Sequence, residues 1–454
     1  MSDLAAVILA AGKGTRMKSA LPKVLHRVSG KPMVEHVVEA ADFAGANRKI
    51  VVIGFGAESV QETLNGRCEF VVQAEQLGTG HAVMQAKDLL RDFNGTVMVL
   101  CGDTPLLQGE LLMQLVTGHR ETGAAATVLT ARMPDPSGYG RVIRDTNGQV
   151  VKIVEQKDAA PDELLVDEVN TGIYCFERAA LFDALEGIDC KNMQGEYYLT
   201  DVIGILARRR QKVWAVVARN HQDTLGINSK VQLAQAEKIL RNRKLIALME
   251  NGVTIMDPDS TFIDAEVSIG PDTIIYPFTW LEGATIIGSN CEIGPNTRIY
   301  NTAVGDNTVL HFVYAHECRI GDEVTVGPYV HLRPNTSLAK GVKIGNFVEV
   351  KNSEVGENSK IPHLSYIGDT DMGARVNIGS GTITVNYDGK NKHRTVIEDR
   401  AFIGCNTNLV APVTVGQGSY VAAGSTITKD VPPDALGVAR ARQSNIEGWA
   451  NKHR

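Results

Sequence analysis

The stretch IGPDTIIYPFTWLEGATIIGSNCEIGPNTRI, from Ile269 to Ile299, carries an aliphatic residue at every sixth position. These positions are Ile269, Ile275, Leu281, Ile287, Ile293 and Ile299. A period of six is neither that of an α-helix nor that of a simple alternating strand. It indicates a repeat in which each hexad contributes one short strand and a turn. Three such hexads would form one coil of a triangular prism, with the aliphatic side chains along its axis.

The same period returns further along the chain after shifts of phase. It is carried by Ile320, Val326, Leu332, then Ile344, Val350, and finally Ile397, Ile403, Leu409, Val415, Val421, Ile427. From Ile378 to Ile397 the spacing is 19 residues, one more than three hexads, and we expect the turn-rich segment Asn386–Lys390 to leave the prism wall. The repeat resembles the hexapeptide-repeat acyltransferases, which implies an all-β left-handed parallel β-helix.

The N-terminal half alternates strand-like and helix-like stretches instead. The strand-like runs are Val7–Ala10, Ile50–Ile53, Phe70–Val72, Val97–Leu100 and Ala125–Leu129. Helical spacing in Met33–Ala44 and Ala82–Leu90 favours a mainly parallel, Rossmann-like sheet covered by helices. We therefore expect an α/β nucleotide-binding domain over 1–230, a helical linker over 231–251 and a hexapeptide-repeat domain with a polar tail over 252–454.

Composition narrows the class of protein. The chain has 454 residues, a length that suits two or three globular domains. Its net charge of −6 argues against a nucleic-acid partner. Apolar runs such as Ala5–Ala11 are too short to span a membrane. The seven cysteines are scattered without a C-x-x-C pair, which argues against zinc or a disulfide framework and predicts a cytoplasmic location.

A glycine-rich loop, Gly12-Lys13-Gly14-Thr15-Arg16, follows the first expected strand. It lacks the third glycine of a dinucleotide fingerprint and the spacing of a P-loop. Its glycines let backbone N–H groups approach a ligand, and Lys13, Arg16 and Lys23 can neutralise a polyphosphate. By itself the loop could equally be a solvated basic turn.

Eight segments in sequence order resemble the sugar-nucleotide pyrophosphorylases. They are LAAGKGTRM…LPKVL (9–25), QAEQLGTGHA (73–82), LCGDTPLL (100–107), GYGRV (138–142), VEQKDA (154–159), NTGIY (170–174), QGEYYLTD (194–201) and GINSK (226–230). The resemblance implies that a sugar 1-phosphate oxygen attacks the α-phosphorus of UTP, with Mg²⁺ present, and that pyrophosphate leaves. The choice of UTP among the nucleotides rests on this resemblance.

The resemblance also implies roles for single residues. Lys23 would hold the triphosphate, Arg16 the leaving pyrophosphate, and Asp103 with Asn228 the Mg²⁺ ion. Gln73 would meet the uracil edge, since an amide can donate and accept. The full set expected to hold UTP and the UDP-sugar is Leu9, Ala10, Ala11, Gly12, Lys23, Gln73, Gly78, Thr79, Gly140, Glu155, Asn170, Tyr198, Thr200 and Asn228.

Polar segments interrupt the hexads of the second half. They are HLRPNTSL (331–338), NFVEVKNS (346–353), PHLSYIGD (362–369), VNIGSGTITVNYDGKNKH (376–393) and GCNTNLVAPVTVG (404–416). With both halves in this order, the chain resembles the bifunctional N-acetylglucosamine-1-phosphate uridyltransferase/glucosamine-1-phosphate acetyltransferase family. That implies acetyl transfer from acetyl-CoA to glucosamine 1-phosphate, then uridylyl transfer to N-acetylglucosamine 1-phosphate. The product, UDP-N-acetylglucosamine, supplies peptidoglycan and lipopolysaccharide synthesis.

His363 matches the base that takes the amine proton, a task that suits a histidine near neutral pH. The family resemblance assigns binding of the amino-sugar phosphate to Arg333, Lys351, Tyr366, Asn377, Asn386 and Lys392. It assigns acetyl-CoA to Ser380, Asn386, Tyr387, Cys405, Ala423 and Arg440. Family members often carry Ala in place of Ser380 and Ser in place of Cys405, and we expect these small changes to preserve the site. Cys405 has no evident base partner, so it is not expected to be a nucleophile.

The resemblance further implies a homotrimer in which the tail with Arg440 completes a neighbour's site. One alternative is a single-activity pyrophosphorylase whose β-helix serves assembly or regulation. Another is a sugar-nucleotide-binding protein without turnover. A scaffold would not need His363, Asn386, Tyr387 and Lys392, and a binding protein would not need the metal pair Asp103 and Asn228.

Overall fold

The structure is a computed structural model that describes residues 3–454. Its contacts divide the chain into two compact units, one ending at Leu240 and one spanning Arg241–Arg454. The division falls within helix α7 (Lys230–Glu250), close to the helical linker expected from the sequence. Within 3–454, none of the helices combines the length and the apolar character that crossing a membrane requires.

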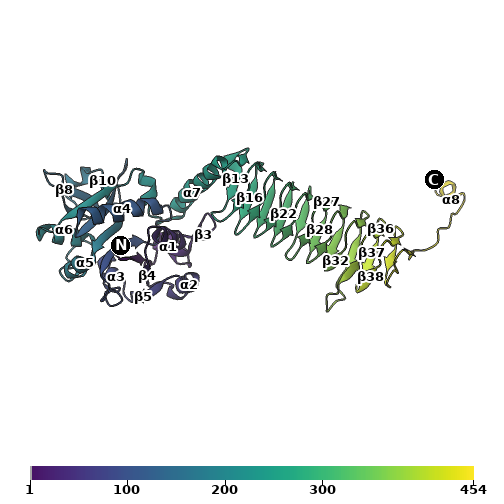
Figure 1. The fold of residues 1–454 in the computed structure, drawn as a ribbon, viewed down its shortest axis with the longest axis horizontal. Helices are drawn as coiled ribbons and strands as arrows, with labels where there is room; N and C mark the ends of the chain where they lie inside the picture. The colour runs from purple at the N-terminus through teal and green to yellow at the C-terminus, as the bar shows by residue number, and fades with distance from the viewer. Residues whose placement is uncertain (1–2) are drawn as a thin grey trace. The chain divides into compact units, whose positions relative to one another are not determined.

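The first unit is built on a mixed sheet (Figure 1). Its strand order is β11-β7-β10-β6-β1-β4-β5. Neighbouring strands are parallel except at β10, which runs antiparallel between β6 and β7. The hairpin of β8 and β9 joins this sheet through β10. The strands are β1 (Asp3–Leu9), β4 (Arg48–Ile53), β5 (Glu69–Val72), β6 (Gly95–Cys101), β7 (Ala126–Arg132), β8 (Arg141–Arg144), β9 (Val150–Val154), β10 (Glu168–Glu177) and β11 (Val213–Val217).

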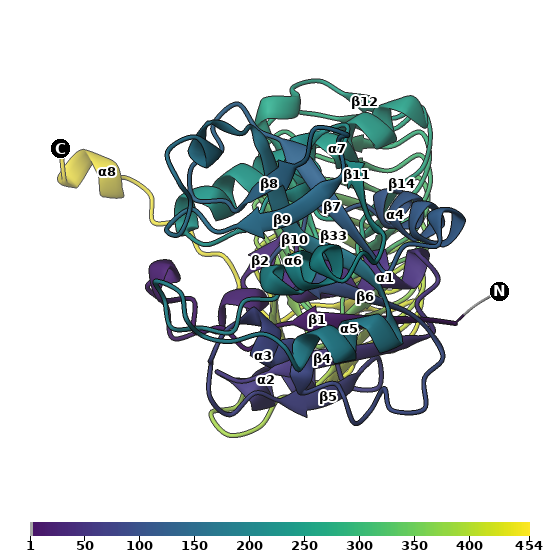
Figure 2. The ribbon, with the colours of Figure 1, turned by 90° about the vertical axis from the view of Figure 1, so that its left-hand side faces the viewer.

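Helices cover both faces of this sheet (Figure 2). Ala6 and Ile8 of β1 pack in one hydrophobic cluster with α1 (Met33–Phe43), α2 (Ala57–Thr63) and α4 (Gly109–Thr122). Ala5 and Val7, which point to the other face, pack with α3 (Thr79–Met84), α5 (Arg178–Leu185) and α6 (Thr200–Arg208). A strand buried on both faces reads as a continuous apolar run, which explains the sequence of β1. Helix α3 ends at Met84, earlier than the predicted helical stretch that continued to Leu90.

The second unit is a parallel β-helix, as the hexads predicted, and it is left-handed, as the resemblance to the hexapeptide-repeat acyltransferases implied. Its strands belong in rotation to three parallel sheets, from β12 (Thr254–Ile255) to β41 (Leu436–Gly437). On most adjacent coils the partners are 16 to 18 positions apart, as Ile299 and Ala315 or Ile275 and Ile293 are. The exceptions are the first coil, where Ile255 pairs with Ile275, and the coil that contains an inserted loop. From Ile275 to Ile427 the aliphatic hexad residues are at most 4% exposed and form the axial core.

Two of these sheets carry the candidate site residues. One contains β27 (Lys343–Asn346), β30 (Lys360–His363), β33 (Asn377–Ile378), β36 (Phe402–Ile403) and β39 (Tyr420–Val421). The other contains β16 (Thr279–Glu282), β19 (Thr297–Tyr300), β22 (Val313–His316), β25 (Val330–Leu332), β28 (Glu349–Lys351), β31 (Tyr366–Gly368) and β34 (Ile383–Val385).

One coil contains an inserted loop between β34 and β35 (Thr395–Ile397). The partner of Ile378 is Ile403, 25 positions on and therefore seven more than a full coil of 18. The expectation of one added residue was wrong, because Ile378 and Ile397 belong to different sheets. The segment does leave the prism wall (Figure 1), and Tyr387 and Lys392 pair across it in an antiparallel bridge.

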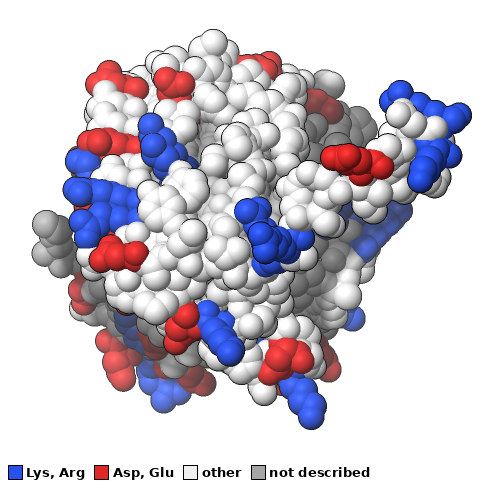
Figure 3. Space-filling model, turned by 90° about the vertical axis from the view of Figure 1, so that its right-hand side faces the viewer, with Lys and Arg blue, Asp and Glu red and all other residues white. Residues whose placement is uncertain are grey.

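The two ends of the β-helix differ. Leu245 and Leu248 of α7 pack against its first coils and close the apolar axis there. At the other end, Figure 3 shows a face that is mostly uncharged, with a few Lys or Arg side chains on it and further charged side chains around its margin. The tail that follows is exposed from Val438 onward and contains the short helix α8 (Trp449–Lys452).

Candidate functional sites in the two units

The first unit has a cavity of about 250 Å³ at the carboxyl ends of β1 and β6. This is the edge of a parallel sheet at which ligands bind. The lining includes nine residues expected from the sequence: Leu9, Ala10, Ala11, Gly12, Lys23, Gln73, Gly78, Thr79 and Asp103. Val24, Gln76, Ala82, Cys101 and Glu196 complete the wall and were not predicted.

Lys23 joins the two expected metal ligands. Its Nζ forms an ion pair with Asp103 Oδ2 and donates to Asn228 Oδ1 at 3.1 Å. Both charged side chains are mostly shielded, with exposed fractions of 16% and 17%. Asn228 comes to this point because the amide of Ile227 donates to the Asp103 carbonyl at 2.9 Å. Two residues 125 positions apart in the sequence thus present oxygens to one cation.

Two glycines make the close approaches around this cavity possible. Gly14 has φ 58°, and a Cβ there would lie 2.6 Å from Lys23 Cβ. Gly78 has φ 110°, and a Cβ there would lie 2.6 Å from the Tyr197 carbonyl oxygen. The Tyr197 amide donates to Leu77 O at 2.8 Å, which ties together two of the segments singled out in the sequence. Neither approach would tolerate a side chain at the glycine.

A neighbouring cavity of about 380 Å³ contains Glu155, Tyr198 and Thr200. Thr200 Oγ1 donates to Glu155 Oε1 at 3.3 Å, but burial raises the pKa of the Glu155 carboxyl. The other two expected sugar contacts lie close to this set. A Cβ on Gly140 would be 3.4 Å from the Glu155 carboxylate, and the amide of Asn170 donates to Gly140 O at 2.9 Å.

Arg16 does not line either of these cavities. It lies exposed on the short 3-10 helix η1 (Thr15–Met17), after the glycine loop. A further residue that the sequence analysis did not single out is His81, which follows Gly78 and Thr79 on α3. Its Nδ1 is 3.1 Å from Gln73 Nε2. Only its place inside QAEQLGTGHA could have drawn attention to it.

In the second unit, His363 ends β30 and is exposed to solvent. Its Nδ1 is hydrogen bonded to Asn346 Oδ1, and Asn346 is its register partner on the preceding coil. Because a carboxamide oxygen only accepts, Nδ1 carries the proton and Nε2 keeps its lone pair. Asn346 was not predicted from the sequence, because its position beside His363 depends on the coil register.

His363 begins a straight column of expected ligand-binding residues. Ile361, Ile378, Ile403 and Val421 occupy corresponding positions on successive strands of one sheet. The residue two places after each of them is, in order, His363, Ser380, Cys405 and Ala423. Arg440 Nη1 donates to Ala423 O at 2.9 Å, so the tail reaches the end of the column in its own chain.

A polar cluster gathers around the buried carboxylate of Asp369, a residue that the sequence analysis did not name. Asn352 and Asn386 donate to it, and Lys351 Nζ lies 3.6 Å away. These two hydrogen bonds lower the pKa of Asp369 although burial opposes them. A hydrogen bond and charge repulsion from Lys351 lower the pKa of Lys392. Two neighbouring ammonium groups of this kind suit an anionic ligand.

The remaining expected residues lie around this cluster. The Tyr366 hydroxyl is 3.4 Å from Asn386 Nδ2, and Arg333 Nη1 pairs with Glu349 at 2.8 Å. Tyr387 is 57% exposed on the inserted loop, with its hydroxyl donating to Gly389 O at 2.7 Å. Asn377 starts β33, one coil after Lys360 of β30.

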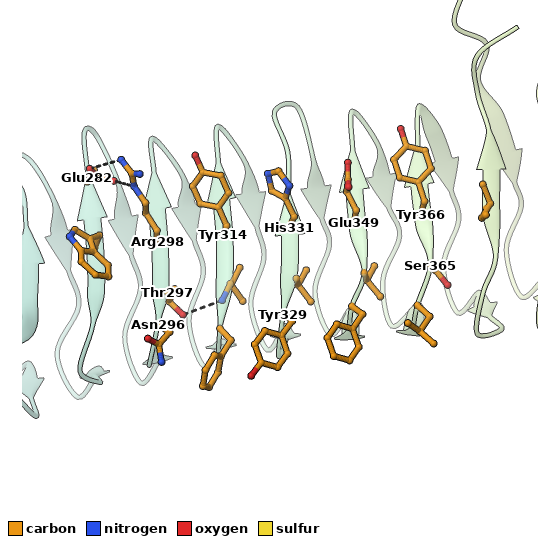
Figure 4. Close-up of a pocket in the computed structure, with 18 residues that line it drawn as sticks. Glu282, Asn296, Thr297, Arg298, Tyr314, Tyr329, His331, Glu349, Ser365 and Tyr366 are labelled. Atoms are coloured by element: carbon orange, nitrogen blue, oxygen red, sulfur yellow. Dashed lines mark hydrogen bonds and ion pairs between the residues drawn. The ribbon is translucent and has the colours of Figure 1, made fainter. Parts of the chain in front are cut away.

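An open apolar groove of about 1090 Å³ follows the other sheet and its corner (Figure 4). Phe312, Tyr329, Phe347 and Leu364 stand along the corner with φ between 48° and 60°. The three rings contact one another from coil to coil: Phe312 and Tyr329 are tilted with centroids 5.2 Å apart, and Tyr329 and Phe347 are stacked with centroids 5.3 Å apart. Bulky side chains are rare at positive φ, so this apolar row, half-buried at Phe312 and exposed from Tyr329 to Leu364, is a specific feature of the surface.

Comparisons with known proteins cover both units. The model of the nucleotidyl transferase family matches residues 5–237. A model described as bacterial transferase hexapeptide (six repeats) matches 317–352 and 394–429, and one described as the hexapeptide repeat of succinyl-transferase matches 284–311.

Relatives similar to the whole chain carry one name, "Bifunctional protein GlmU". One from Geobacillus sp. (strain WCH70) is 55% identical over 447 residues, 98% of this chain and 97% of its own. One from Halalkalibacterium halodurans is 52% identical, over 100% of this chain and 99% of its own. One from Listeria monocytogenes serovar 1/2a is 51% identical over the same shares. A solved UDP-glucose pyrophosphorylase in complex with UDP-glucose has a TM-score of 0.44 at 19% identity and covers 54% of this chain and 100% of its own.

Proposed function

This chain belongs to the bifunctional GlmU family, and on that premise we propose which of its residues carry each of the two transfer reactions. It is an enzyme of UDP-N-acetylglucosamine synthesis, an N-acetyltransferase joined to a nucleotidyltransferase, with nucleotide and acetyl-CoA substrates. The single-activity alternative is not favoured. What supports the residue assignment most is that each unit holds its own convergent polar site. We place the change from one activity to the other at α7, with boundaries at 230 and 251.

The cavity beside β1 and β6 takes UTP, and the cavity with Glu155 takes the N-acetylated sugar phosphate. An oxygen of the sugar phosphate attacks the α-phosphorus, and the bond to the pyrophosphate oxygen breaks. Lys23 holds the triphosphate, and the exposed Arg16 closes on the pyrophosphate. No covalent intermediate is needed, so the residues act by positioning and by neutralising charge.

Asp103 and Asn228 fit a hard divalent cation. Their oxygens already converge on the Lys23 ammonium, which stands where a metal ion would share them. Within the described residues 3–454 no three His, Cys, Asp or Glu side chains gather as a metal site. One carboxylate and one amide suit Mg²⁺, which keeps several waters and takes few protein ligands. When bound, Mg²⁺ would neutralise charge on the phosphates.

Lys23→Met is expected to strengthen divalent-cation binding in the absence of nucleotide. The methionine removes the ammonium that competes for the two oxygens, and loss of such a shielded ion pair is worth about tenfold in affinity. Titration of Mn²⁺, with the free ion followed by electron paramagnetic resonance, measures the change. Lys13→Met, at an exposed lysine of the same loop, is the matched control. Unchanged Mn²⁺ affinity in Lys23→Met would contradict the shared position.

Acetyl transfer takes place around His363 and the Asp369 cluster. The glucosamine nitrogen attacks the thioester carbonyl, a C–N bond forms and the C–S bond to coenzyme A breaks. His363 Nε2 accepts the proton that the amine loses, because Asn346 holds the proton of the ring on Nδ1. Arg333, Lys351 and Lys392 hold the phosphate, with Tyr366, Asn377 and Asn386 on the sugar.

Acetyl-CoA extends from His363 along the column of Ser380, Cys405 and Ala423, with Tyr387 and Asn386 beside the thioester. Register places these residues on consecutive coils. Arg440 already contacts the last of them in its own chain, so a neighbour's tail is not required to bring a guanidinium there. The exposed end of the tail remains free to reach another copy.

The apolar groove is covered by a second copy of the chain in a homotrimer. Exposed fractions of 57% for Tyr329, 54% for Phe347 and 61% for Leu364 are large for a continuous apolar row. Each coil adds one apolar side chain to the row, so the matching face of a second, identical β-helix can pack along the whole length of the row. We place this trimer in the cytoplasm, with small molecules as its other partners.

The variant Tyr329→Asn with Phe347→Asn is expected to dissociate the trimer. Each ring contributes about 2 kcal/mol when buried at an interface. Asn is tolerated at positive φ and already occupies such positions at Asn301, Asn335 and Asn352, so the coils should still fold. Light scattering after gel filtration measures the mass against the 49.0 kDa of one chain. Trp214→Asn, at an exposed aromatic of the first unit, should keep the native mass, and a native mass in the double variant would exclude the groove as the interface.

One assay tests the assignment as a whole. The protein is incubated with glucosamine 1-phosphate, acetyl-CoA, UTP and Mg²⁺, and free coenzyme A and pyrophosphate are followed together. Coenzyme A release followed by pyrophosphate is expected. Pyrophosphate appearing only when acetylated sugar phosphate is supplied would remove the acetyl-transfer proposal for the β-helix.

A further inference from the structure

The carboxylate of Asp369 lies among the residues proposed to bind the amino-sugar phosphate. It follows β31 at a corner of the β-helix and is 4% exposed. Its Oδ1 accepts from Asn352 Nδ2 and its Oδ2 from Asn386 Nδ2, while Lys351 Nζ is 3.6 Å from Oδ2. We infer that Asp369 is a positioning residue of acetyl transfer, which fixes the end of the Asn386 amide that meets the amino sugar. This inference rests on the proposed contact between Asn386 and the sugar.

Asp369 carries a negative charge at neutral pH. Burial raises the pKa of its carboxyl group, but the hydrogen bonds from Asn352 and Asn386 lower this pKa. The ammonium groups of Lys351 and Lys392 act in the same direction, and the resulting pKa lies below the ordinary value. An ionised carboxylate can only accept hydrogen bonds, so each amide that faces it must present a proton.

The charge of Asp369 decides the orientation of the Asn386 amide. The amino group must face the carboxylate, because the amide oxygen would meet a second acceptor there. The Tyr366 hydroxyl, 3.4 Å from Asn386 Nδ2, does not set the orientation, since a hydroxyl can donate as well as accept. Among the described residues 3–454, none donates to Asn386 Oδ1, so this oxygen is the end left for a ligand.

The backbone holds both partners of this hydrogen bond in place. The amide of Thr395 donates to Asp369 O at 3.1 Å, and the amide of His393 donates to Asn386 O at 2.8 Å. Asn386 is 7% exposed. A Cβ on Gly368 would lie 2.7 Å from Asn386 Nδ2, so this glycine leaves the room that the amide occupies. The surroundings fix where the amide lies, and Asp369 fixes which of its ends faces outward.

A fixed amide oxygen suits an amino sugar. The hydroxyl and amino groups of glucosamine 1-phosphate can donate protons to Asn386 Oδ1. An amide that could turn would present its amino group part of the time, and ordering it when the substrate binds would weaken binding. A substrate donor that met the wrong end would lose its acceptor. Asp369 removes both costs before the substrate arrives.

The test is the KM for glucosamine 1-phosphate in acetyl transfer by the full-length enzyme. Asp369→Gly removes the acceptor, and KM is expected to rise about tenfold with little change in kcat. Glycine suits the backbone there, because Gly283 follows Leu281 at the same corner as Asp369 follows Ile367, also at positive φ. Asp272→Gly, at an exposed aspartate with φ 60°, is the matched control and should keep the native KM.

Asp369→Asn separates the acceptor from the charge. Both variants remove the negative charge, but asparagine keeps one oxygen. Lys351 can only donate and therefore favours this oxygen at the place of Oδ2, where Asn386 also donates. Asp369→Asn should thus bring KM back toward the native value. Loss of the negative charge alone would favour the anionic substrate and lower KM, so a rise in Asp369→Gly cannot be a charge effect.

Asn386→Ala tests the contact through which Asp369 acts. This variant should raise KM by itself, and Asp369→Gly should add no further rise in its background. Light scattering after gel filtration shows that each variant is assembled like the native protein.

The outcomes distinguish the inference from the proposed function. If Asn386→Ala raises KM and Asp369→Gly does not, only the role of Asp369 is wrong. An equal rise in Asp369→Gly and Asp369→Asn would also overturn that role. If Asn386→Ala leaves KM unchanged, the proposed contact between Asn386 and the sugar fails, and the inference fails with it.

Discussion

Replacing His363 by alanine is expected to lower the rate of acetyl transfer by about 10²–10⁴-fold, the usual contribution of a general base. Asn346 Oδ1 accepts a hydrogen bond from the Nδ1–H group of His363, which leaves Nε2 as the only ring nitrogen that can take a proton. Without it, the amine of the substrate would have to lose its proton to water. Uridylyl transfer should be unaffected, because the nucleotide cavity belongs to the other unit.

The measurement uses two readouts on one preparation. Coenzyme A released from acetyl-CoA and glucosamine 1-phosphate reports the first reaction. Pyrophosphate released from UTP and N-acetylglucosamine 1-phosphate reports the second. His311→Ala, at another partly exposed histidine of the β-helix, is the matched control and should preserve both. Native coenzyme A release from His363→Ala would assign the base to another group.

Replacing Asp103 by alanine is expected to lower uridylyl transfer and to leave acetyl transfer intact, the reverse of the effect of His363→Ala. Uridylyl transfer should fall by about 10³-fold, because the variant loses the only carboxylate of the proposed metal pair and the partner of Lys23. Acetyl transfer should continue, so N-acetylglucosamine 1-phosphate should accumulate. The accumulation separates a chemical defect from general unfolding.

A second readout makes this prediction independent of turnover. Mn²⁺ binding to the Asp103→Ala variant should be lost, whereas Asp88→Ala, at an exposed carboxylate paired with Arg91, should bind normally. Retained Mn²⁺ binding together with lost activity would mean that Asp103 acts only through Lys23. Retained activity would remove Asp103 from the reaction.

Much of the fold was predictable because burial repeats at a fixed period. The hexad aliphatics point to the axis of the β-helix. The apolar runs of the first half are strands of the first unit, buried except for Phe70–Val72 at the sheet edge. The antiparallel strand β10 was missed, since its sequence does not distinguish its direction. The length of the inserted loop was misjudged, because spacing along the chain does not reveal which of three sheets a hexad joins.

The candidate sites were predictable only in part. Resemblance identified residues such as Lys23 and Asp103, and the fold brings them into one cavity. It did not identify the groups that orient them. Asn346 is hydrogen bonded to His363 from the preceding coil, and His81 Nδ1 on a neighbouring helix lies 3.1 Å from Gln73 Nε2. Such contacts depend on register and on a single turn of backbone, which local sequence does not encode.

The regular coil gives the column of residues after His363 a constant spacing. Each coil advances the chain by about 4.8 Å, the spacing of adjacent strands, so Ala423 lies three coils or about 14 Å from His363. If acetyl-CoA binds along this column as proposed, a substitution at Ser380 or Cys405 changes a contact at a fixed distance along the ligand without changing that distance. Loops at the other corners, including the insertion after β34, can vary in length. The spacing between successive residues of the column stays constant.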